Sequence, residues 1–512
     1  MIVRTEYLSA RTRDRAQASA SFFAKPSAPL TVVAFFVVAV TLLSSCASFP
    51  ARRLYPGSDT LLPGTAAAMN TPGYWISRHP APDAPILDGP GIAAFNRAVI
   101  ERKLTRDLAA WEPKLLEETR KDMEDSVSWI ASLKVYDRSG RRVGNRFLAP
   151  IRDAIAASEI LGDRAQYGFL ARQTDLRVLP TDEPLYDGPR DPYIDNIQAS
   201  SLEAGTALVV QAETSDRAWL FVATEKATGW LRSESAAIAT RDDFLARYER
   251  KDALTVISAK ADLWDNPGRT RFAYAVRMGT GLLAAQAEEG TATAPAAAPD
   301  ASSSVIPVSM PDRDENGRLT ERILWVSRDA VVEGFLPCTP RSIYEEAFKL
   351  LNAPYGWGGS FGEQDCSQFL CEVFATTGVA LPRNSTKQAK AGVPLRGFAE
   401  IAGSDQVARA AILTERAKPA ATLLRLPGHI MLYLGSVDGV PYAIHETFGY
   451  REKAPFGERI RLINRVVVST LNLGAGTSVG SHLSRITGVI LIENEQEPSA
   501  TVAAAQAEKP HP

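Results

Sequence analysis

The sequence has few of the residues on which disulfide frameworks and polyanion binding depend. Only four cysteines and five histidines occur among 512 residues. Beyond Cys46, which ends an N-terminal segment described next, the cysteines are Cys338, Cys366 and Cys371. An odd number argues against a disulfide framework, and Cys338 with Cys371 can either pair or stay reduced. The formal net charge of −2 supplies no basic field for a nucleic acid, so we expect none as a partner.

The first apolar run is too short to cross a membrane. It spans 14 residues, Leu30 to Leu43, against the roughly 20 that a bilayer requires. Basic residues precede it, and Leu43-Ser44-Ser45-Cys46 follows it, a pattern typical of a secretory signal. The last four residues also resemble a bacterial lipobox. We therefore expect cleavage after residue 45, a lipid on Cys46 and attachment to the periplasmic face of the outer membrane, with plain secretion as the alternative.

Periodicity divides the remaining chain into a helical, a β-rich and a mixed part. Apolar residues at three- to five-residue steps predict helices, and short β-prone runs between turn residues predict two small barrels. The predicted fold class is a multidomain α+β protein. The predicted boundaries are 1–45 for the signal, 46–72 for a tether, 73–165 for a helical unit, 166–245 for the first barrel, 246–337 for the second barrel with a disordered insert at 284–304, 338–493 for the mixed domain, and 494–512 for a disordered tail.

Cys366 is placed as a nucleophile would be. It follows a glycine-rich turn, 354–359, and precedes an apolar stripe that predicts a helix up to Gly378. Unpaired N–H groups at a helix start stabilise a thiolate, and the glycines would let backbone approach a substrate closely. Asp365 is a competent N-cap for this helix. Cys371 lies inside the predicted helix, and we assign it to the core.

A cysteine nucleophile needs a histidine as its base. His429 opens an apolar run at 429–435 and His445 ends another at 441–445. These runs predict a hairpin with Asp438-Gly439 as its turn, so that one imidazole acts as base while the other orients it. His482, in a Gly/Ser-rich stretch, is set aside.

Each of these features has a plainer interpretation when taken alone. A cysteine at a helix start is more often a small buried residue, and a histidine at a strand end is more often structural. Their combination favours catalysis. The spacings Cys366-x4-Cys371 and His429-x15-His445 are poor for zinc, so we expect no metal and no other cofactor.

Four motifs resemble those of the NlpC/p60-type cell-wall cysteine peptidases, which are papain-like enzymes. They are Pro354-Tyr355-Gly356-Trp357-Gly358-Gly359, Asp365-Cys366-Ser367, Leu381-Pro382-Arg383-Asn384-Ser385 and Gly428-His429-Ile430. The two barrels resemble the SH3-like domains of the SH3-containing branch, and the helical unit resembles its N-terminal stabilising domain. Gln368 stands where the family usually has glycine. This substitution replaces no catalytic group.

The resemblance implies a complete site and a substrate. It makes Cys366 the nucleophile, His429 the base and His445 the third polar residue. It also assigns substrate binding to Tyr355, Asp365, Ser367, Arg383 and Ser385, with Asp365 facing a free amine and Arg383 a carboxylate. An aromatic of the first barrel, such as Trp230, would close the groove. The implied reaction is hydrolysis of the γ-D-glutamyl–diaminopimelate bond of peptidoglycan stem peptides or muropeptides, by a monomer, in cell-wall remodelling or recycling.

Two further interpretations stay open. The chain could be a lipid-anchored scaffold that binds peptidoglycan through its barrels while its papain-like domain is inactive. The same nucleophile could also transfer the acyl group to an acceptor other than water. The sequence does not distinguish intact cell wall from released muropeptides.

Overall fold

A computed structural model describes residues 61–189, 192–250, 252–285 and 304–494. The predicted signal, Cys46 and most of the tether lie outside these ranges, as do most of the predicted insert and tail. In the described ranges, no helix has the length and apolar character that crossing a membrane requires.

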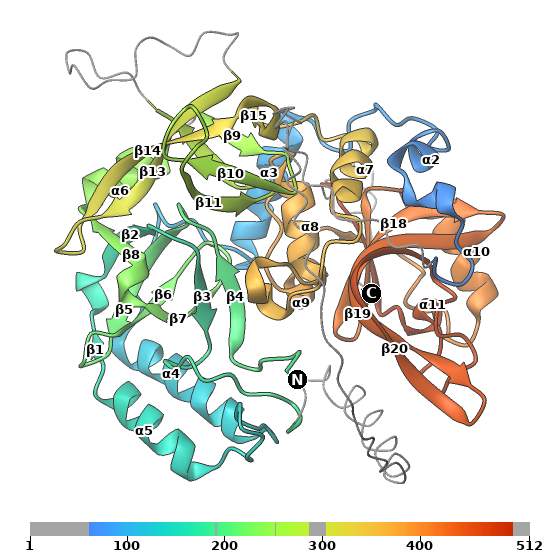
Figure 1. The fold of residues 1–512 in the computed structure, drawn as a ribbon. Helices are drawn as coiled ribbons and strands as arrows, with labels where there is room; N and C mark the ends of the chain where they lie inside the picture. Colours follow the sequence, from blue (N-terminus) through green and yellow to red (C-terminus); the bar gives the residue numbers. More distant parts are fainter. Residues whose placement is uncertain (1–60, 190–191, 251, 286–303, 495–512) are drawn as a thin grey trace, which may run out of the picture. The chain divides into compact units, whose positions relative to one another are not determined.

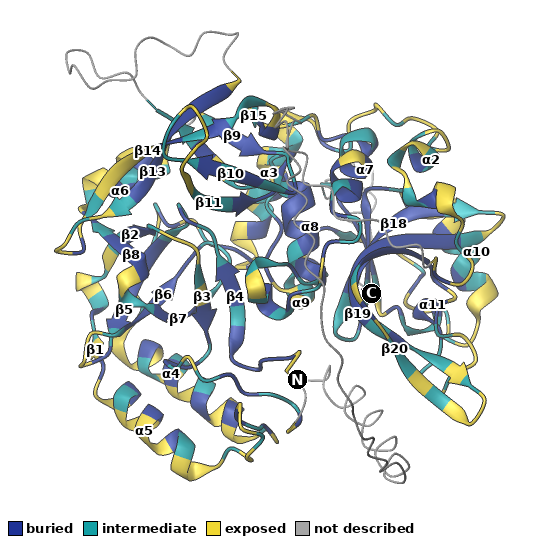
Figure 2. Ribbon diagram, viewed as in Figure 1, coloured by how far each residue is buried: buried dark blue, intermediate teal, exposed yellow. Residues whose placement is uncertain are grey.

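The N-terminal helices belong to two hydrophobic clusters. Their bounds are Ala67–Asn70 (η1), Pro72–Ile76 (α2), Gly89–Glu101 (α3), Leu116–Ala131 (α4) and Asn145–Ala156 (α5). Trp75 and Phe95 pack with the C-terminal domain, whereas Met123 of α4 and Ile151 of α5 pack under the first β-sheet. The region 73–165, predicted as one helical unit, therefore serves two partners. In Figure 2 the outer faces of α4 and α5 are exposed, as amphipathic helices require.

The first predicted barrel is an eight-stranded antiparallel sheet. Its strands are Glu159–Ile160 (β1), Gln166–Leu170 (β2), Thr174–Arg177 (β3), Gln198–Leu202 (β4), Ala207–Glu213 (β5), Trp219–Ala223 (β6), Thr228–Arg232 (β7) and Ala236–Ala239 (β8), with short turns Gly162–Arg164 (η2) and Ser233–Ser235 (η3). The strand order is β4-β3-β7-β6-β5-β2-β8, and β1 pairs with β5. Because the end strands β4 and β8 do not pair in the described structure, the sheet is open where a closed barrel was predicted.

The second predicted barrel is a seven-stranded sheet reached through α6 (Arg241–Tyr248). Its strands are Ala253–Val256 (β9), Lys260–Trp264 (β10), Phe272–Arg277 (β11), Gly281–Ala284 (β12), Val305–Arg313 (β13), Leu319–Ser327 (β14) and Val331–Glu333 (β15), with the turn Arg328–Ala330 (η4). The order is β11-β10-β14-β13-β12-β9-β15, so this sheet is open as well. Figure 1 shows α6 between the two sheets.

The C-terminal domain combines helices with a six-stranded sheet of order β16-β21-β17-β18-β19-β20. Its helical elements are Pro340–Lys349 (α7), Trp357–Gly362 (η5), Cys366–Ala375 (α8), Ser385–Gln388 (α9), Gln406–Arg416 (α10) and His482–Arg485 (α11). Its strands are Val393–Pro394 (β16), Thr422–Leu426 (β17), His429–Val437 (β18), Val440–Ala454 (β19), Gly457–Thr470 (β20) and Gly488–Leu491 (β21). The predicted fold class, helices with two β-rich domains and a mixed C-terminal domain, is confirmed.

The predicted histidine hairpin is present. β18 and β19 are antiparallel and pair Leu432 with Ile444 and Val437 with Val440. The turn residues Asp438 and Gly439 have φ of 51° and 75°, the conformation that a two-residue type I′ turn requires. This confirms the expected turn and brings His429 and His445 onto neighbouring strands.

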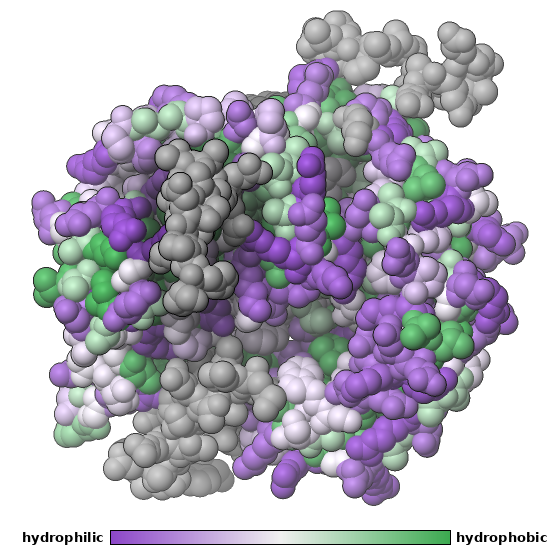
Figure 3. All heavy atoms as spheres, turned by 180° about the vertical axis from the view of Figure 1, so that it is seen from behind, coloured by the Kyte–Doolittle hydropathy of each residue, from purple (hydrophilic) through white to green (hydrophobic). Residues whose placement is uncertain are grey.

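Helix α8 is central to the C-terminal domain. It packs against β18 and β19, and Phe369, Leu370 and Val373 of its inner face are completely buried. Figure 2 shows α8 as largely buried. On the face of the molecule seen from behind, hydrophilic residues predominate and hydrophobic ones form scattered groups (Figure 3), so the apolar residues concentrate inside.

Candidate active site

Cys366 is the first residue of α8, as predicted. Asp365 caps the helix, and its carboxylate accepts hydrogen bonds from the backbone N–H groups of Ser367 and Gln368. Cys366 is 7% exposed. Burial, reinforced by the negative charge of Asp365, raises the pKa of the Cys366 thiol to about 12. The helix start therefore does not lower this pKa as expected from the sequence, because burial disfavours the thiolate and the negative charge of the capping carboxylate adds to that effect.

The two predicted histidines form a hydrogen-bonded chain. His429 Nε2 lies 2.8 Å from His445 Nδ1, and His445 Nε2 lies 2.8 Å from the hydroxyl of Ser469 on β20. Burial lowers the pKa of both imidazoles well below the usual range, so both are neutral near pH 7. The arrangement leaves His429 Nδ1 available for a proton from the nucleophile.

Cys366 lies against the strand that begins with His429. The backbone of Ile430, the next residue along β18, acts to lower the pKa of the Cys366 thiol and therefore lies beside the sulfur. Cys366 and Ile430 also belong to one hydrophobic cluster. The start of α8 therefore lies beside the start of β18, which is the arrangement that a cysteine–histidine pair needs.

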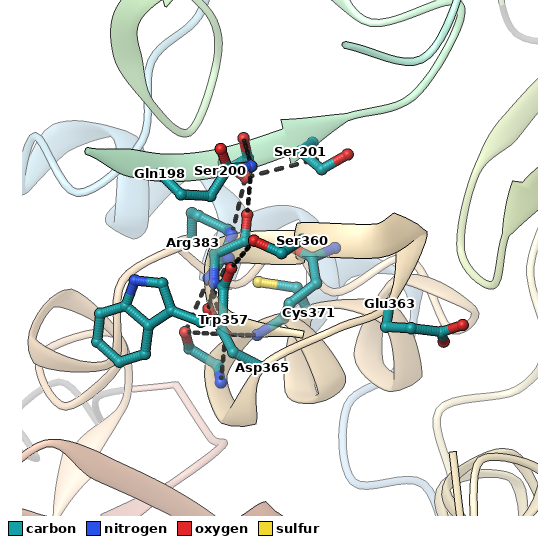
Figure 4. Close-up of polar contacts among 12 residues, drawn as sticks. Gln198, Ser200, Ser201, Trp357, Ser360, Glu363, Asp365, Cys371 and Arg383 are labelled. Carbon is teal, nitrogen blue, oxygen red and sulfur yellow. Dashed lines mark hydrogen bonds and ion pairs between the residues drawn. The ribbon is translucent and has the colours of Figure 1, made fainter. Parts of the chain in front are cut away.

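Asp365 and Arg383 belong to a network of polar contacts (Figure 4). The guanidinium of Arg383 grips both carboxylate oxygens of Asp365, at 3.0 and 2.7 Å. It also donates to the hydroxyl of Ser367 at 2.9 Å and to that of Ser200, on β4 of the first sheet, at 2.9 Å. Burial acts to raise the pKa of Asp365, but Arg383 holds it below its usual range. The two charges assigned to opposite ends of a substrate thus neutralise each other in the resting structure.

The comparisons with known proteins address this C-terminal domain directly. Residues 352–445, which contain the cysteine, the arginine and both histidines, match the model of the NlpC/P60 family. Residues 184–232 match the model described as SH3 domain (SH3b1 type). The chain carries an NlpC/P60 domain. It is a peptidase-like domain of the cell-wall type, preceded by an SH3 domain.

One solved structure supports the fold. The chain is similar to an NlpC/P60 endopeptidase from Photobacterium damselae subsp. piscicida, with 19% identity and a TM-score of 0.65 over 83% of this chain and 98% of that one. It is also similar to an NlpC/P60 family protein from Bacillus cereus ATCC 10987, with 15% identity and a TM-score of 0.43 over 64% of this chain and 100% of that one. No curated protein matches the sequence.

The remaining predicted substrate residues of the NlpC/P60 domain are more scattered. Tyr355 is half-buried, and its ring centroid lies 6.1 Å from that of Phe448 on β19. Ser385 is the first residue of α9, where Asn384 supplies the cap. Trp230 does not line a groove, because its side chain is fully buried in the first sheet's core. Tyr193, in the turn between β3 and β4, has its ring centroid 5.2 Å from that of Phe448.

The glycines before the nucleophile contact another domain. A Cβ on Gly358 would lie 2.6 Å from the carbonyl oxygen of Gln198, and one on Gly359 would lie 2.6 Å from Cβ of Ser201. Both glycines have positive φ, 60° and 83°. These residues, which the sequence predicts to let backbone approach a substrate, let strand β4 approach the NlpC/P60 domain. Figure 4 shows Gln198 and Ser201 above this loop.

Two buried polar residues near the site escaped the sequence analysis. His482 is 5% exposed, and its ring centroid lies 5.5 Å from that of His445 and 6.3 Å from that of His429. Glu446, next to His445 on β19, is completely buried, and neither carboxylate oxygen has a hydrogen-bond partner in the described structure. His482 was overlooked because it lies in a Gly/Ser-rich stretch. Glu446 could have been found from strand alternation, because neighbours on a strand point to opposite faces and Glu446 therefore faces away from His445.

The three described cysteines, Cys338, Cys366 and Cys371, are reduced and buried. In the described ranges, no group of three or more His, Cys, Asp and Glu side chains is placed to hold a metal ion.

Proposed function

We propose that the chain is a cysteine endopeptidase that hydrolyses the γ-D-glutamyl–diaminopimelate bond of peptidoglycan stem peptides. The observation that carries the proposal is the sulfur of Cys366 beside the strand that starts with His429, with His429, His445 and Ser469 joined by hydrogen bonds. The matches to the NlpC/P60 and SH3 models support the cell-wall substrate class.

The geometry supports a general-base route. Neutral His429 takes the thiol proton of Cys366 as the sulfur attacks the amide carbon, and the bond to His445 stabilises the imidazolium that forms. A backbone N–H at the start of α8, that of Cys366 itself, stabilises the oxyanion. His429 then protonates the leaving amine, and water releases the acyl group from sulfur. No step requires a cofactor.

Binding of a substrate would act on the Asp365–Arg383 pair. A substrate carboxylate that draws Arg383 away from Asp365 frees that carboxylate for an ammonium, so both ends of the peptide are recognised in one exchange. The hydroxyls of Ser367 and Ser385, with the ring of Tyr355, would complete the groove.

We propose that the protein acts in the cell envelope. The basic N-terminal residues, the apolar run and the Leu-Ser-Ser-Cys sequence support a lipid on Cys46 and a position at the periplasmic face of the outer membrane. Radiolabelled palmitate incorporation in wild type but not in Cys46→Ser would test it; equal labelling of both would contradict it.

Replacing Cys366 tests the peptidase proposal. Wild type is expected to split L-Ala-γ-D-Glu-diaminopimelate into L-Ala-γ-D-Glu and diaminopimelate, and Cys366→Ala is expected to lose at least about 1,000-fold in kcat/KM. Mass spectrometry of the products measures both. Cys338→Ala is the matched control, since Cys338 is buried among core residues. Undiminished hydrolysis by Cys366→Ala would refute the mechanism.

The raised thiol pKa favours one alternative, a scaffold that binds stem peptides without cutting them. In that case wild type binds the tripeptide in calorimetry, whereas neither wild type nor Cys366→Ala releases diaminopimelate. Release by wild type alone rejects the scaffold.

A further inference from the structure

A cavity of about 530 Å³ lies where the first and second β-sheets meet helix α8. The α8 residues that line it are four positions of one helix face, Gln368, Cys371, Glu372 and Ala375. Cys366, His429 and His445 are not among its lining residues, whereas Arg383 is, so the cavity adjoins the candidate active site without including its cysteine and histidines. Its volume suits a small molecule, since ligand sites of about 300–1,000 Å³ commonly lie between domains.

One side of the cavity carries two carboxylates but only one guanidinium to neutralise them. Arg277 Nε lies 2.6 Å from Glu203 Oε1 and 3.4 Å from Glu372 Oε1, so two carboxylates share one guanidinium. Glu372 is 3% exposed. Its Oε1 accepts from Gln368 Nε2 at 3.0 Å, while Oε2 has no hydrogen-bond partner in the described structure. A buried oxygen of this kind is costly unless a donor satisfies it.

The other side of the cavity offers a free cation. Lys226, in the turn between β6 and β7, is half-buried and lines the cavity. Within the described ranges it forms neither an ion pair nor a hydrogen bond, unlike the lining arginines. Their carboxylate partners are Glu321 for Arg247, Asp252 for Arg250, Asp365 for Arg383 and Glu203 for Arg277.

We propose that this cavity is a second binding site, for a small zwitterion such as an amino acid or a short peptide. An ammonium of the ligand donates to the open oxygen of Glu372 beside Glu203, and a carboxylate of the ligand pairs with Lys226. The occupant touches the helix whose first residue is Cys366. The proposal does not rest on the peptidase function, because the site needs neither Cys366 nor the histidines.

Three ligands on one carbon skeleton test the two charges separately. Diaminopimelate carries ammonium and carboxylate groups, 1,5-diaminopentane is the same skeleton without the carboxylates, and pimelate is the skeleton without the amines. Calorimetry on the full-length Cys366→Ser chain is expected to show diaminopimelate binding at least about tenfold more tightly than either control, because each loses one charge-assisted contact. No binding of diaminopimelate, or equal binding of a control, would overturn the proposal.

Lys226→Met locates the site. This turn substitution is expected to weaken diaminopimelate binding at least about tenfold and to leave the binding of 1,5-diaminopentane unchanged. Lys134→Met removes the same charge from an exposed position outside the cavity and is expected to change neither affinity. If Lys226→Met binds diaminopimelate as well as Lys134→Met does, the ligand is bound elsewhere, as at the active site, and the proposal fails.

Discussion

At the scale of single residues, the site consists of buried groups, and their burial disfavours the charged form. Burial raises the pKa of the Cys366 thiol and lowers that of His429. Burial therefore favours the neutral form of both groups, which is the starting state of the proposed general-base route.

Glu446 gives the clearest dependence of stability on pH. Burial, with the negative charges of Asp365 and Glu372, raises its pKa well above the usual value of a glutamate. A group with a raised folded-state pKa contributes stability at low pH that is lost as the pH rises through that pKa. The side chain of Glu446→Gln stays neutral. The free energy of unfolding of this variant is therefore expected to rise relative to that of wild type by up to about 1.4 kcal/mol per pH unit above about pH 4.5.

Urea unfolding at a series of pH values measures this gain in the free energy of unfolding. Glu117→Gln, in the exposed first turn of α4, is the control and is expected to follow wild type. A difference between Glu446→Gln and wild type that stays constant from pH 5 to pH 8 would show that the carboxyl is solvated.

At the scale of elements, the loop before α8 serves an interface. Gly358 and Gly359 face β4 at distances that leave no room for a side chain, and Arg383 reaches from the NlpC/P60 domain to Ser200. The glycine motif before Cys366 thus also holds the SH3 domain beside this residue, which explains why a glycine pair is needed there.

Gly358→Ala and Gly334→Ala separate the two reasons for a glycine at such a position, which are the positive φ and the close approach of another strand. Both positions have similar positive φ, 60° and 64°, but a Cβ on Gly334 meets no atom within 4 Å. Gly334→Ala is expected to cost about 1 kcal/mol of unfolding free energy from backbone strain alone. Gly358→Ala is expected to cost about 3 kcal/mol, because its Cβ also collides with Gln198. Equal losses in urea unfolding would show that β4 yields without cost.

At the scale of the whole molecule, distant segments complete one core. Trp75 of α2 is 2% exposed, donates from its indole to Met69 O at 2.8 Å, and lies 5.6 Å from the ring of Tyr442 on β19. Asn96 of α3 donates to Gly378 O at 2.9 Å. The NlpC/P60 domain therefore depends on a segment that precedes it by more than 200 residues in the chain.

Trp75→Ala is expected to destabilise the C-terminal domain by about 3–5 kcal/mol, since it empties a large buried volume. Hydrogen exchange should accelerate in β18 and β19 as well as in α2. Leu115→Ala, at a residue 71% exposed, is the control and is expected to change stability by less than about 0.5 kcal/mol. Acceleration confined to α2 would show that the helix is only peripheral.

The sequence by itself determined the local features. Helix α8 with its cysteine at the first position, the two-residue turn between β18 and β19 and the order of helical, β-rich and mixed regions depend on neighbours in the chain, which periodicity and turn chemistry report. Because the hairpin register depends on its turn, the sequence also brought His429 and His445 together.

Only the tertiary structure decided what surrounds those residues. The Arg383–Asp365 pair, the approach of β4 to Gly358, the third histidine His482 and the cavity along α8 all join segments far apart in the chain. Nothing in local periodicity encodes such contacts, because they depend on how separate sheets and helices pack. The protonation state of Cys366 belongs with them: a helix start favours a thiolate, but the burial imposed by the fold, together with the capping Asp365, keeps the sulfur protonated.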